Sequence, residues 1–313
     1  MAMFDLLHDD IYCIDAAYMR DQMVSIYMIR EGDEVAFIDT GTQYSIDNVL
    51  ATLDELNIHR SQVRYVIPTH IHLDHAGGAS AMMRQFDQAR LIIHPRGARH
   101  MIDPARLIEG SIGVYGESAF RQLYGDIEPI EQDRIDIAND LDRYLLGSRE
   151  LLFIDTPGHA RHHFCIFDEK SRGIFSGDTF GVAYPALKQH PRGLIPSTPP
   201  TQFDPEALLN SMDRLLEYQP RWMYLTHFGE IGYPQRYAED FRLWISDYVG
   251  LSERYEPCDA ESTQRLETEL KEMILSRLAD GDRGADHLMP LLENDIRLNA
   301  EGIAHWWRTT HNG

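Results

Sequence analysis

The stretch that decides the fold reads Tyr65-Val66-Ile67-Pro68-Thr69-His70-Ile71-His72-Leu73-Asp74-His75. It opens with an apolar run typical of a buried strand and ends with three imidazoles and one carboxylate in six positions. Neutral imidazole and ionised carboxylate are ligands that zinc, iron and manganese accept. Because the same groups gathered without a cation would carry a desolvation cost, the stretch predicts a metal centre at a strand end.

The spacing inside residues 70–75 suggests more than one ion. His70 and His72 are two positions apart, so in extended backbone they project to the same side and can hold one ion together. Asp74 and His75 fall where the chain should turn into a helix, which begins near Ala76. They are therefore expected to point elsewhere, as a second ion would require.

Three later segments repeat the same design, in which a short apolar run ends in a metal-competent side chain and a turn. They supply His159, Asp178 and His227. If their strands share a sheet and run the same way, the strand ends can converge on one cleft. The complete set exceeds the ligands of one four- or five-coordinate ion, so we expect two ions with Asp178 as a shared bridge. The candidate ligands are His70, His72, Asp74, His75, His159, Asp178 and His227.

These motifs, together with Ile38-Asp39-Thr40-Gly41, make residues 10–235 resemble the metallo-β-lactamase superfamily. The resemblance implies an α/β fold, a four-layered αββα sandwich with helices outside two facing sheets. It also implies one ion held by His70, His72 and His159, a second held by Asp74, His75 and His227, and a bridge through Asp178. The commonest class of true β-lactamases has cysteine where Asp178 stands, so the chain is more similar to the glyoxalase II branch.

Other polar residues have competing interpretations. Asp39 either orients a metal-bound histidine from behind or caps the turn at Thr40 and Gly41. His162 and His163 are expected to begin the next strand. Four further histidines have no ligand partner in the sequence and are interpreted as surface or structural residues, namely His59, His94, His100 and His190.

Composition limits the classes of partner. The chain has 313 residues, 43% of them hydrophobic, and a formal net charge of −21. That charge would repel phosphate backbones and anionic membranes, so a small-molecule substrate is expected rather than nucleic acid or a membrane. The three cysteines, Cys13, Cys165 and Cys258, lie far apart, which favours a reduced cytoplasmic setting. The N-terminus does not resemble an export signal, and no apolar run is long enough to span a membrane.

The expected catalytic domain covers residues 1–236 and a helical extension covers 237–313. In the first part, strands are expected at 11–14, 24–29, 35–38, 63–67 and 91–94, and helices at 45–57 and 76–86. In the extension, apolar positions at helical spacing predict helices over 262–278 and 287–298. Their apolar faces are expected to pack on the main domain, although a homodimer contact or a wall of the substrate pocket would use the same residues.

Two long segments interrupt the pattern. Residues 95–145 contain glycines at 110, 113 and 116 and a short helical pattern near Phe120. They form either a lid over the cleft or a helical insert packed on the shoulder of the domain. Residues 183–203 carry five prolines and are expected to be a loop. Its cations either bind an anionic part of the substrate or only solvate the loop; they are Lys188, His190 and Arg192.

Two adjacent cations lower the pKa of a shared water and yield a bridging hydroxide, so hydrolysis follows from the predicted site. Asp74 would ligate one ion and orient the nucleophile. The leading hypothesis is a hydrolase with two divalent ions, zinc ahead of iron or manganese, that cleaves a thioester or related ester.

Alternatives remain open at this point. Phosphodiesterases and lactonases of the same superfamily have nearly the same ligands. Persulfide dioxygenases resemble the pattern but use one iron, on residues that match His70, His159 and Asp178. A non-catalytic metal-bound sensor would keep the ligands without turnover. Flavodiiron proteins are disfavoured, because they usually have glutamate where His72 stands and carry a flavodoxin domain.

Overall fold

The computed structural model describes residues 4–190, 192–279 and 285–311. The chain divides into two compact units. The first comprises Met1–Asp155, His162–Gly177 and Pro220–Gly232, and the second comprises Thr156–Arg161, Asp178–Gln219 and Tyr233–Gly313. The last segment of the first unit ends at Gly232, four residues before the domain boundary predicted from the sequence at residue 236. The second unit also contains two earlier segments, Thr156–Arg161 and Asp178–Gln219.

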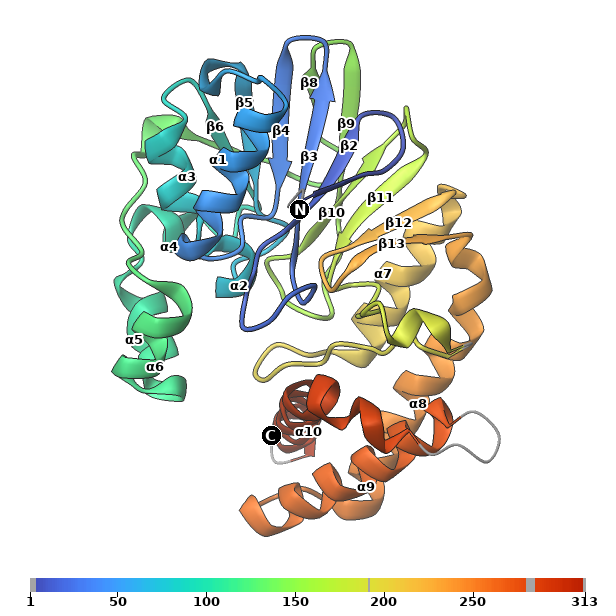
Figure 1. Ribbon diagram of the computed structural model, residues 1–313. Coiled ribbons are helices and arrows are strands. Elements are labelled where there is room, and N and C mark those ends of the chain that lie inside the picture. Colours follow the sequence, from blue (N-terminus) through green and yellow to red (C-terminus); the bar gives the residue numbers. More distant parts are fainter. Residues whose placement is uncertain (1–3, 191, 280–284, 312–313) are drawn as a thin grey trace. The chain divides into compact units, whose positions relative to one another are not determined.

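The described part of the first unit contains two β-sheets (Figure 1). One has seven strands in sequence order, antiparallel from the first to the fourth and parallel from the fourth to the seventh. Its strands are β1 (Phe4–Leu6), β2 (Ile11–Asp15), β3 (Ser25–Glu31), β4 (Glu34–Ile38), β5 (Val63–Ile67), β6 (Arg90–Ile93) and β7 (Ile135–Ile137).

The other sheet has the order β13-β12-β11-β10-β9-β8. Its strands are β8 (Arg143–Leu146), β9 (Arg149–Asp155), β10 (Phe164–Asp168), β11 (Gly173–Gly177), β12 (Trp222–Leu225) and β13 (Gly229–Gly232). Both β9 and β11 pair antiparallel with β10, and β11 pairs parallel with β12. Strands β9, β11 and β12 therefore run in one direction, which is the condition that the sequence analysis set for their ends to converge.

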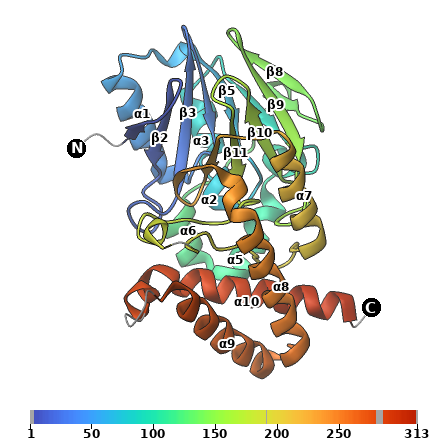
Figure 2. The same cartoon turned by 90° about the vertical axis from the view of Figure 1, so that its right-hand side faces the viewer.

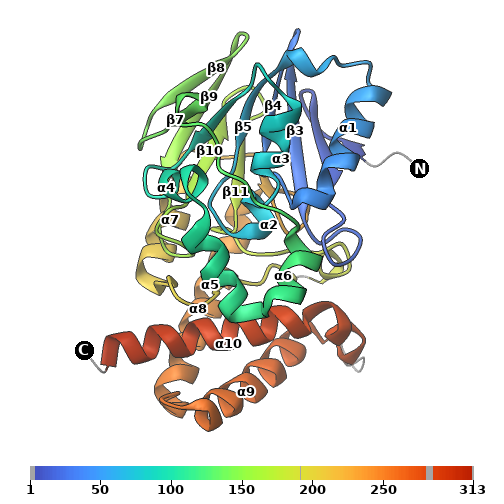
Figure 3. The same ribbon diagram turned by 90° about the vertical axis from the view of Figure 1, so that its left-hand side faces the viewer.

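The two sheets lie face to face and enclose an apolar core (Figure 2). Tyr27 of β3 shows the contact between them. Its ring meets Phe175 of β11 edge to face at 5.3 Å, and its hydroxyl donates to the carbonyl of Leu225 at 2.5 Å. On the outer side of the seven-stranded sheet lie α1 (Ile46–Glu55), against β2, and α3 (Ala79–Gln85), against β5 and β6 (Figure 3). The predicted α/β class with two sheets and covering helices is confirmed.

The predicted helix over 76–86 is wrong in its extent. Two helices occupy this stretch, α2 (Leu73–Ala76) and α3, with Gly77 and Gly78 between them. At the break the Gly78 N–H donates to the Gly41 carbonyl at 2.9 Å instead of continuing α2, and a Cβ on Gly78 would lie 2.4 Å from the carbonyl oxygen of Thr40. Only glycine fits there. Asp74 and His75 consequently lie on α2 rather than before a helix.

The segment 95–145 contains three helices in the first unit, namely α4 (Ala98–Ile102), α5 (Ala105–Tyr115) and α6 (Glu117–Tyr124). Helix α5 continues through Gly110 and Gly113, because an interior glycine costs only about 1 kcal/mol of helix stability. It ends at Gly116, whose φ is +80°. Tyr124 is buried, and its hydroxyl lies 2.9 Å from that of Tyr18, so α6 packs on the first unit. The lid hypothesis remains a prediction.

The second unit is mainly helical. Its helices are α7 (Pro205–Glu217), α8 (Ala238–Tyr255), α9 (Ala260–Leu278) and α10 (Met289–His311). Helices α8, α9 and α10 pack on one another, which confirms a C-terminal helical extension. Residues 183–203 form a loop with a single short 3₁₀ turn at Leu187–Gln189 among the residues described there. Within the described ranges of the chain, no helix combines the length and apolar character of a membrane span.

A buried ion pair stabilises the second sheet and gives a first prediction. Arg149 and Asp168 are both fully buried, and the guanidinium donates to both carboxylate oxygens, at 2.8 and 2.5 Å. We expect Asp168→Ala to lower the free energy of unfolding by about 3–5 kcal/mol, because it leaves a buried charge without its partner. The measurement is chemical denaturation. The control is Glu117→Ala, which removes one of the two exposed acidic partners of Arg121 and should cost less than about 0.5 kcal/mol. Equal losses in the two variants would contradict this account of the pair.

Candidate metal centre

A buried carboxylate, Asp39, joins several segments of the first unit. Its Oδ1 accepts from the backbone N–H of Thr69 at 2.7 Å and from the Thr69 hydroxyl at 2.9 Å. Its Oδ2 accepts from the Thr226 hydroxyl at 2.7 Å and from His75 Nδ1 at 2.8 Å. The carboxylate thus contacts a histidine ring directly; that it orients this histidine toward a metal stays a prediction.

His75 is held at both its ring and its backbone. Besides the ring contact with Asp39, its carbonyl accepts from the backbone N–H and the hydroxyl of Thr40, both at 2.7 Å. A carboxylate is an acceptor, so the ring proton of neutral His75 lies on Nδ1. The lone pair therefore lies on Nε2, the atom that a metal ion would take.

His227 has the same tautomer for a similar reason. Its Nδ1 lies 3.0 Å from the carbonyl oxygen of Met23, which can only accept a hydrogen bond. Its Nε2 lies 3.4 Å from Asp74 Oδ2, and His75 Nε2 lies 3.7 Å from the same oxygen. The ligand atoms of Asp74, His75 and His227 all lie within 4.8 Å of one another.

These separations fit a metal ion. Tetrahedral bonds of 2.0 to 2.2 Å place neighbouring ligand atoms about 3.3 to 3.6 Å apart. The distances from Asp74 to His227 and His75 lie within or just beyond that range, and they exceed the usual length of a charge-assisted hydrogen bond. The donor set and its spacing are therefore suited to one divalent cation.

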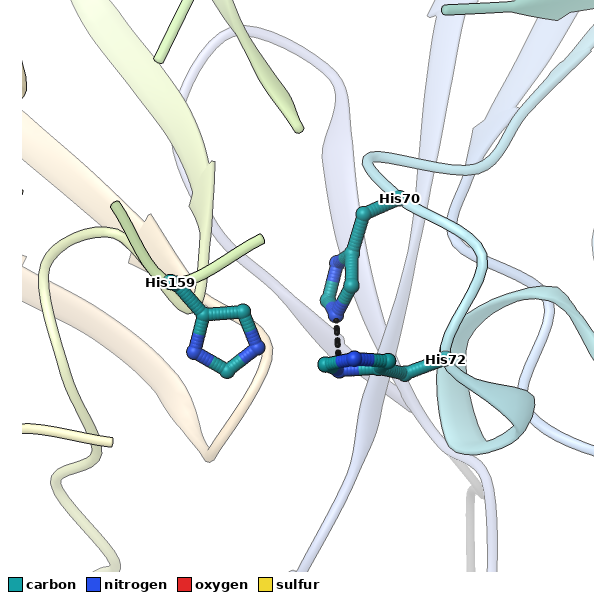
Figure 4. Close-up of side chains that lie close together, drawn as sticks. All are labelled: His70, His72 and His159. Atoms are coloured by element: carbon teal, nitrogen blue, oxygen red, sulfur yellow. Dashed lines mark hydrogen bonds between the residues drawn. The ribbon is translucent and has the colours of Figure 1, made fainter. Parts of the chain in front are cut away.

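His70 and His72 form a second pair in the first unit, and they lie on the same side of the chain as predicted. Figure 4 shows the contact between His70 Nε2 and His72 Nδ1, which are 2.8 Å apart. Thr69 Oγ1 lies 3.1 Å from His70 Nδ1. Because this hydroxyl gives its one proton to Asp39, it accepts from His70, whose Nε2 then carries the lone pair. If both rings bind one ion through these atoms, His70 Nε2 and His72 Nδ1 must move about 0.5 Å further apart.

The second unit contains the other two ligand candidates, and they lie next to each other. His159 Nε2 is 3.4 Å from Asp178 Oδ2, and both side chains are buried. His159 Nδ1 lies 3.1 Å from the carbonyl oxygen of Ser197, and the Ser197 hydroxyl donates to Asp178 Oδ2 at 3.3 Å. The carbonyl places the His159 ring proton on Nδ1, so this histidine has the tautomer of His75 and His227.

Several supporting residues escaped the sequence reasoning. Thr69 and Thr226 both donate to Asp39, and each directly precedes a candidate ligand in a Thr-His pair. The repeated Thr-His pair in the sequence could have identified these two threonines as supporting residues. His163 was expected only to begin a strand, but β10 starts after it at Phe164, and its buried ring stacks on His70 with 4.8 Å between centroids.

Two of the three cationic residues of the 183–203 loop are more exposed than the ligand candidates. Lys188 and Arg192 are exposed, and Arg192 Nε lies 3.6 Å from Asp240 Oδ1. His190 is half-buried, with its ring 6.5 Å from that of His287. Their predicted contact with an anionic substrate stays a prediction.

Substitution of Asp39 tests the support of His75. We expect Asp39→Ala to weaken zinc binding about 10- to 100-fold, because outer groups that orient a ligand histidine have effects of this size. The dissociation constant would be measured by competition with a chromophoric chelator. Asp33→Ala, which removes an exposed carboxylate from the β3–β4 turn, is the control and should bind as the wild type does. Unchanged affinity in Asp39→Ala would show that His75 needs no such support.

Comparison with known proteins gives consistent results. The family model described as the metallo-beta-lactamase superfamily matches residues 19–227. The metallo-beta-lactamase fold-containing protein ST1585 of Sulfurisphaera tokodaii is 25% identical over 229 residues, which are 72% of this chain and 80% of that protein. The human acyl-coenzyme A thioesterase MBLAC2 is 26% identical over 188 residues, 55% of this chain and 64% of its own length.

A solved structure extends the likeness over nearly the whole chain. The metallo-beta-lactamase family protein TTHA1429 from Thermus thermophilus aligns with a TM-score of 0.63 at 21% identity. The alignment covers 97% of this chain and 94% of that protein. At this identity the likeness establishes the shared fold.

Proposed function

The chain belongs to the metallo-beta-lactamase superfamily, and on that premise we propose that it is a metal-dependent hydrolase that cleaves a thioester or related ester. The observation that carries the proposal is the group of Asp74, His75 and His227. Two imidazoles have their protons fixed on Nδ1 and place Nε2 3.4 and 3.7 Å from one carboxylate oxygen. That arrangement suits a divalent cation.

The proposed dinuclear site has two ligand sets. Asp74, His75 and His227 bind one ion, His70, His72 and His159 bind the other, and Asp178 bridges them. Chain connectivity supports this grouping. Asp178 follows the last residue of β11, so its Cα lies about 3.8 Å from that of Gly177. His159 and His227 follow the ends of β9 and β12, which run in the same direction as β11.

The donor atoms narrow the choice of ion. Imidazole nitrogens and carboxylate oxygens bind zinc, iron and manganese, and no thiolate takes part in the proposed set. We propose zinc first. When bound, such ions supply a water of lowered pKa and a Lewis acid that polarises the substrate.

The residues of the chain then have separate tasks. Asp74 keeps 22% of its side chain exposed, so its carboxylate can orient an attacking water and accept its proton while it contacts the ion. The Asp39 carboxylate keeps His75 in one tautomer. Thioester cleavage is proposed over other hydrolyses because the human relative is named an acyl-coenzyme A thioesterase. Assignment to the glyoxalase II branch remains a prediction.

Metal analysis combined with substitution tests the proposal. Elemental analysis of protein purified without added metal is expected to find two equivalents of divalent metal. His72→Ala and Asp74→Ala should each retain about one and lose about 100-fold or more in thioester turnover, because each removes one ligand and Asp74 also acts on the water. Asp54→Ala, a carboxylate exposed on α1, is the control and should match the wild type in both measurements.

Two outcomes would contradict the proposed hydrolase function and indicate a different one. One equivalent of iron that both variants retain, together with oxygen uptake on glutathione persulfide, would indicate a persulfide dioxygenase. Full metal occupancy without turnover across a panel of esters, thioesters and phosphodiesters would indicate a metal-bound sensor.

A further inference from the structure

A buried amide of the C-terminal helix, Asn299, contacts the 183–203 loop on both sides of Ser197. Its Oδ1 accepts from the backbone N–H of Thr198 at 2.7 Å and from the Thr198 hydroxyl at 3.0 Å. Its Nδ2 donates to the carbonyl of Pro196 at 3.0 Å. Asn299 is 2% exposed and Thr198 is fully buried. Both peptide neighbours of Ser197 are therefore fixed to α10.

Ser197 in turn contacts both ligand candidates of the second unit. Its carbonyl accepts from His159 Nδ1, and its hydroxyl donates to Asp178 Oδ2. The carbonyl sets the tautomer and orientation of the imidazole, while the hydroxyl fixes one carboxylate oxygen. A displacement of Ser197 would therefore disturb two proposed ligands at once.

The backbone of α10 approaches the same loop closely one turn later. A Cβ on Gly302 would lie 1.8 Å from the carbonyl oxygen of Thr198 and 2.6 Å from the carbonyl carbon of Pro199. Positions 299 and 302 lie on one face of the helix. Pro196 and Pro199 have fixed φ angles, so the segment around Ser197 has fewer free backbone torsions.

We infer that Asn299 is a positioning residue of the metal centre, which holds His159 and Asp178 in their binding geometry through Ser197. The inference rests on the proposed function, because it assigns these two residues as ligands. The helical extension consequently contributes to metal binding through a side chain that touches no metal ligand itself.

The test compares metal binding by Asn299→Ala with that of the wild type, using zinc or cobalt ions alone. Zinc affinity, measured by chelator competition, is expected to fall about 10- to 100-fold. The visible absorption of the cobalt-loaded protein should change in shape, because the geometry around His159 and Asp178 changes. A general loss of stability would not by itself alter that spectrum.

Two further variants complete the test. Asp295→Ala is the matched control, since Asp295 lies one turn earlier on α10 and accepts from the hydroxyl of Tyr184, thirteen positions before Ser197 in the sequence, at 3.0 and 3.2 Å. Its cobalt spectrum and zinc affinity should equal those of the wild type. Thr198→Val keeps the backbone donor and loses one hydroxyl. Thr198→Val should weaken zinc binding less than Asn299→Ala does. If Asn299→Ala does not fold, the result with Thr198→Val tests the inference.

The possible results separate the two proposals. Wild-type zinc affinity and an unchanged cobalt spectrum in Asn299→Ala, or in Thr198→Val if only that variant folds, would overturn this inference alone. An equal change in Asp295→Ala would also overturn it, because the effect would then be one of general stability. A wild-type protein that binds no zinc would overturn the proposed function and this inference with it.

Discussion

The buried carboxylate of Asp39 is the interaction on which the ligand candidates of the first unit depend. A buried anion is costly unless donors satisfy it, and here two threonine hydroxyls, one backbone N–H and one imidazole do so. Those donors come from Thr69, Thr226 and His75, which belong to segments far apart in the sequence. Folding the carboxylate into the interior therefore requires these segments to meet, and His70 and His227 arrive with them because each directly follows one of the threonines.

A second regularity joins local structure to chemistry. His75, His227 and His159 each direct Nδ1 to an oxygen that only accepts, and His70 directs its Nδ1 to a hydroxyl already engaged as a donor. Four histidines are thus fixed with the lone pair on Nε2. Fixed tautomers reduce the rearrangement that metal binding requires, so the backbone carbonyls and threonines behind the rings are as much a part of the proposed site as the ligands.

Much of the first unit could be predicted from local signals. The ligand candidates were also named from local signals, and their role as ligands stays a prediction. Strand β5 has the predicted bounds, and the β3–β4 hairpin turns at Gly32, where φ is +59°. The prediction failed where contacts between distant segments decide. Gly78 lies between α2 and α3, where its N–H donates to the Gly41 carbonyl and the Thr40 backbone leaves no room for a side chain. Gly110 lies inside α5, where no atom outside the helix backbone comes within 4 Å of an added Cβ. Asn299 and Ser197 are 102 residues apart, and no local pattern relates them.

The most direct test of the central claim, that the fixed histidines and carboxylates bind a pair of ions, is anomalous diffraction at the zinc absorption edge from crystals of the zinc-loaded protein. The account predicts two peaks about 3.5 to 4 Å apart, one of them bonded to Asp74, His75 and His227. Their bonds should measure about 2.0 to 2.2 Å, with His70, His75, His159 and His227 bound through Nε2. A single peak, a peak bonded through Nδ1 of His75 or His227, or zinc bound only at surface residues would contradict it.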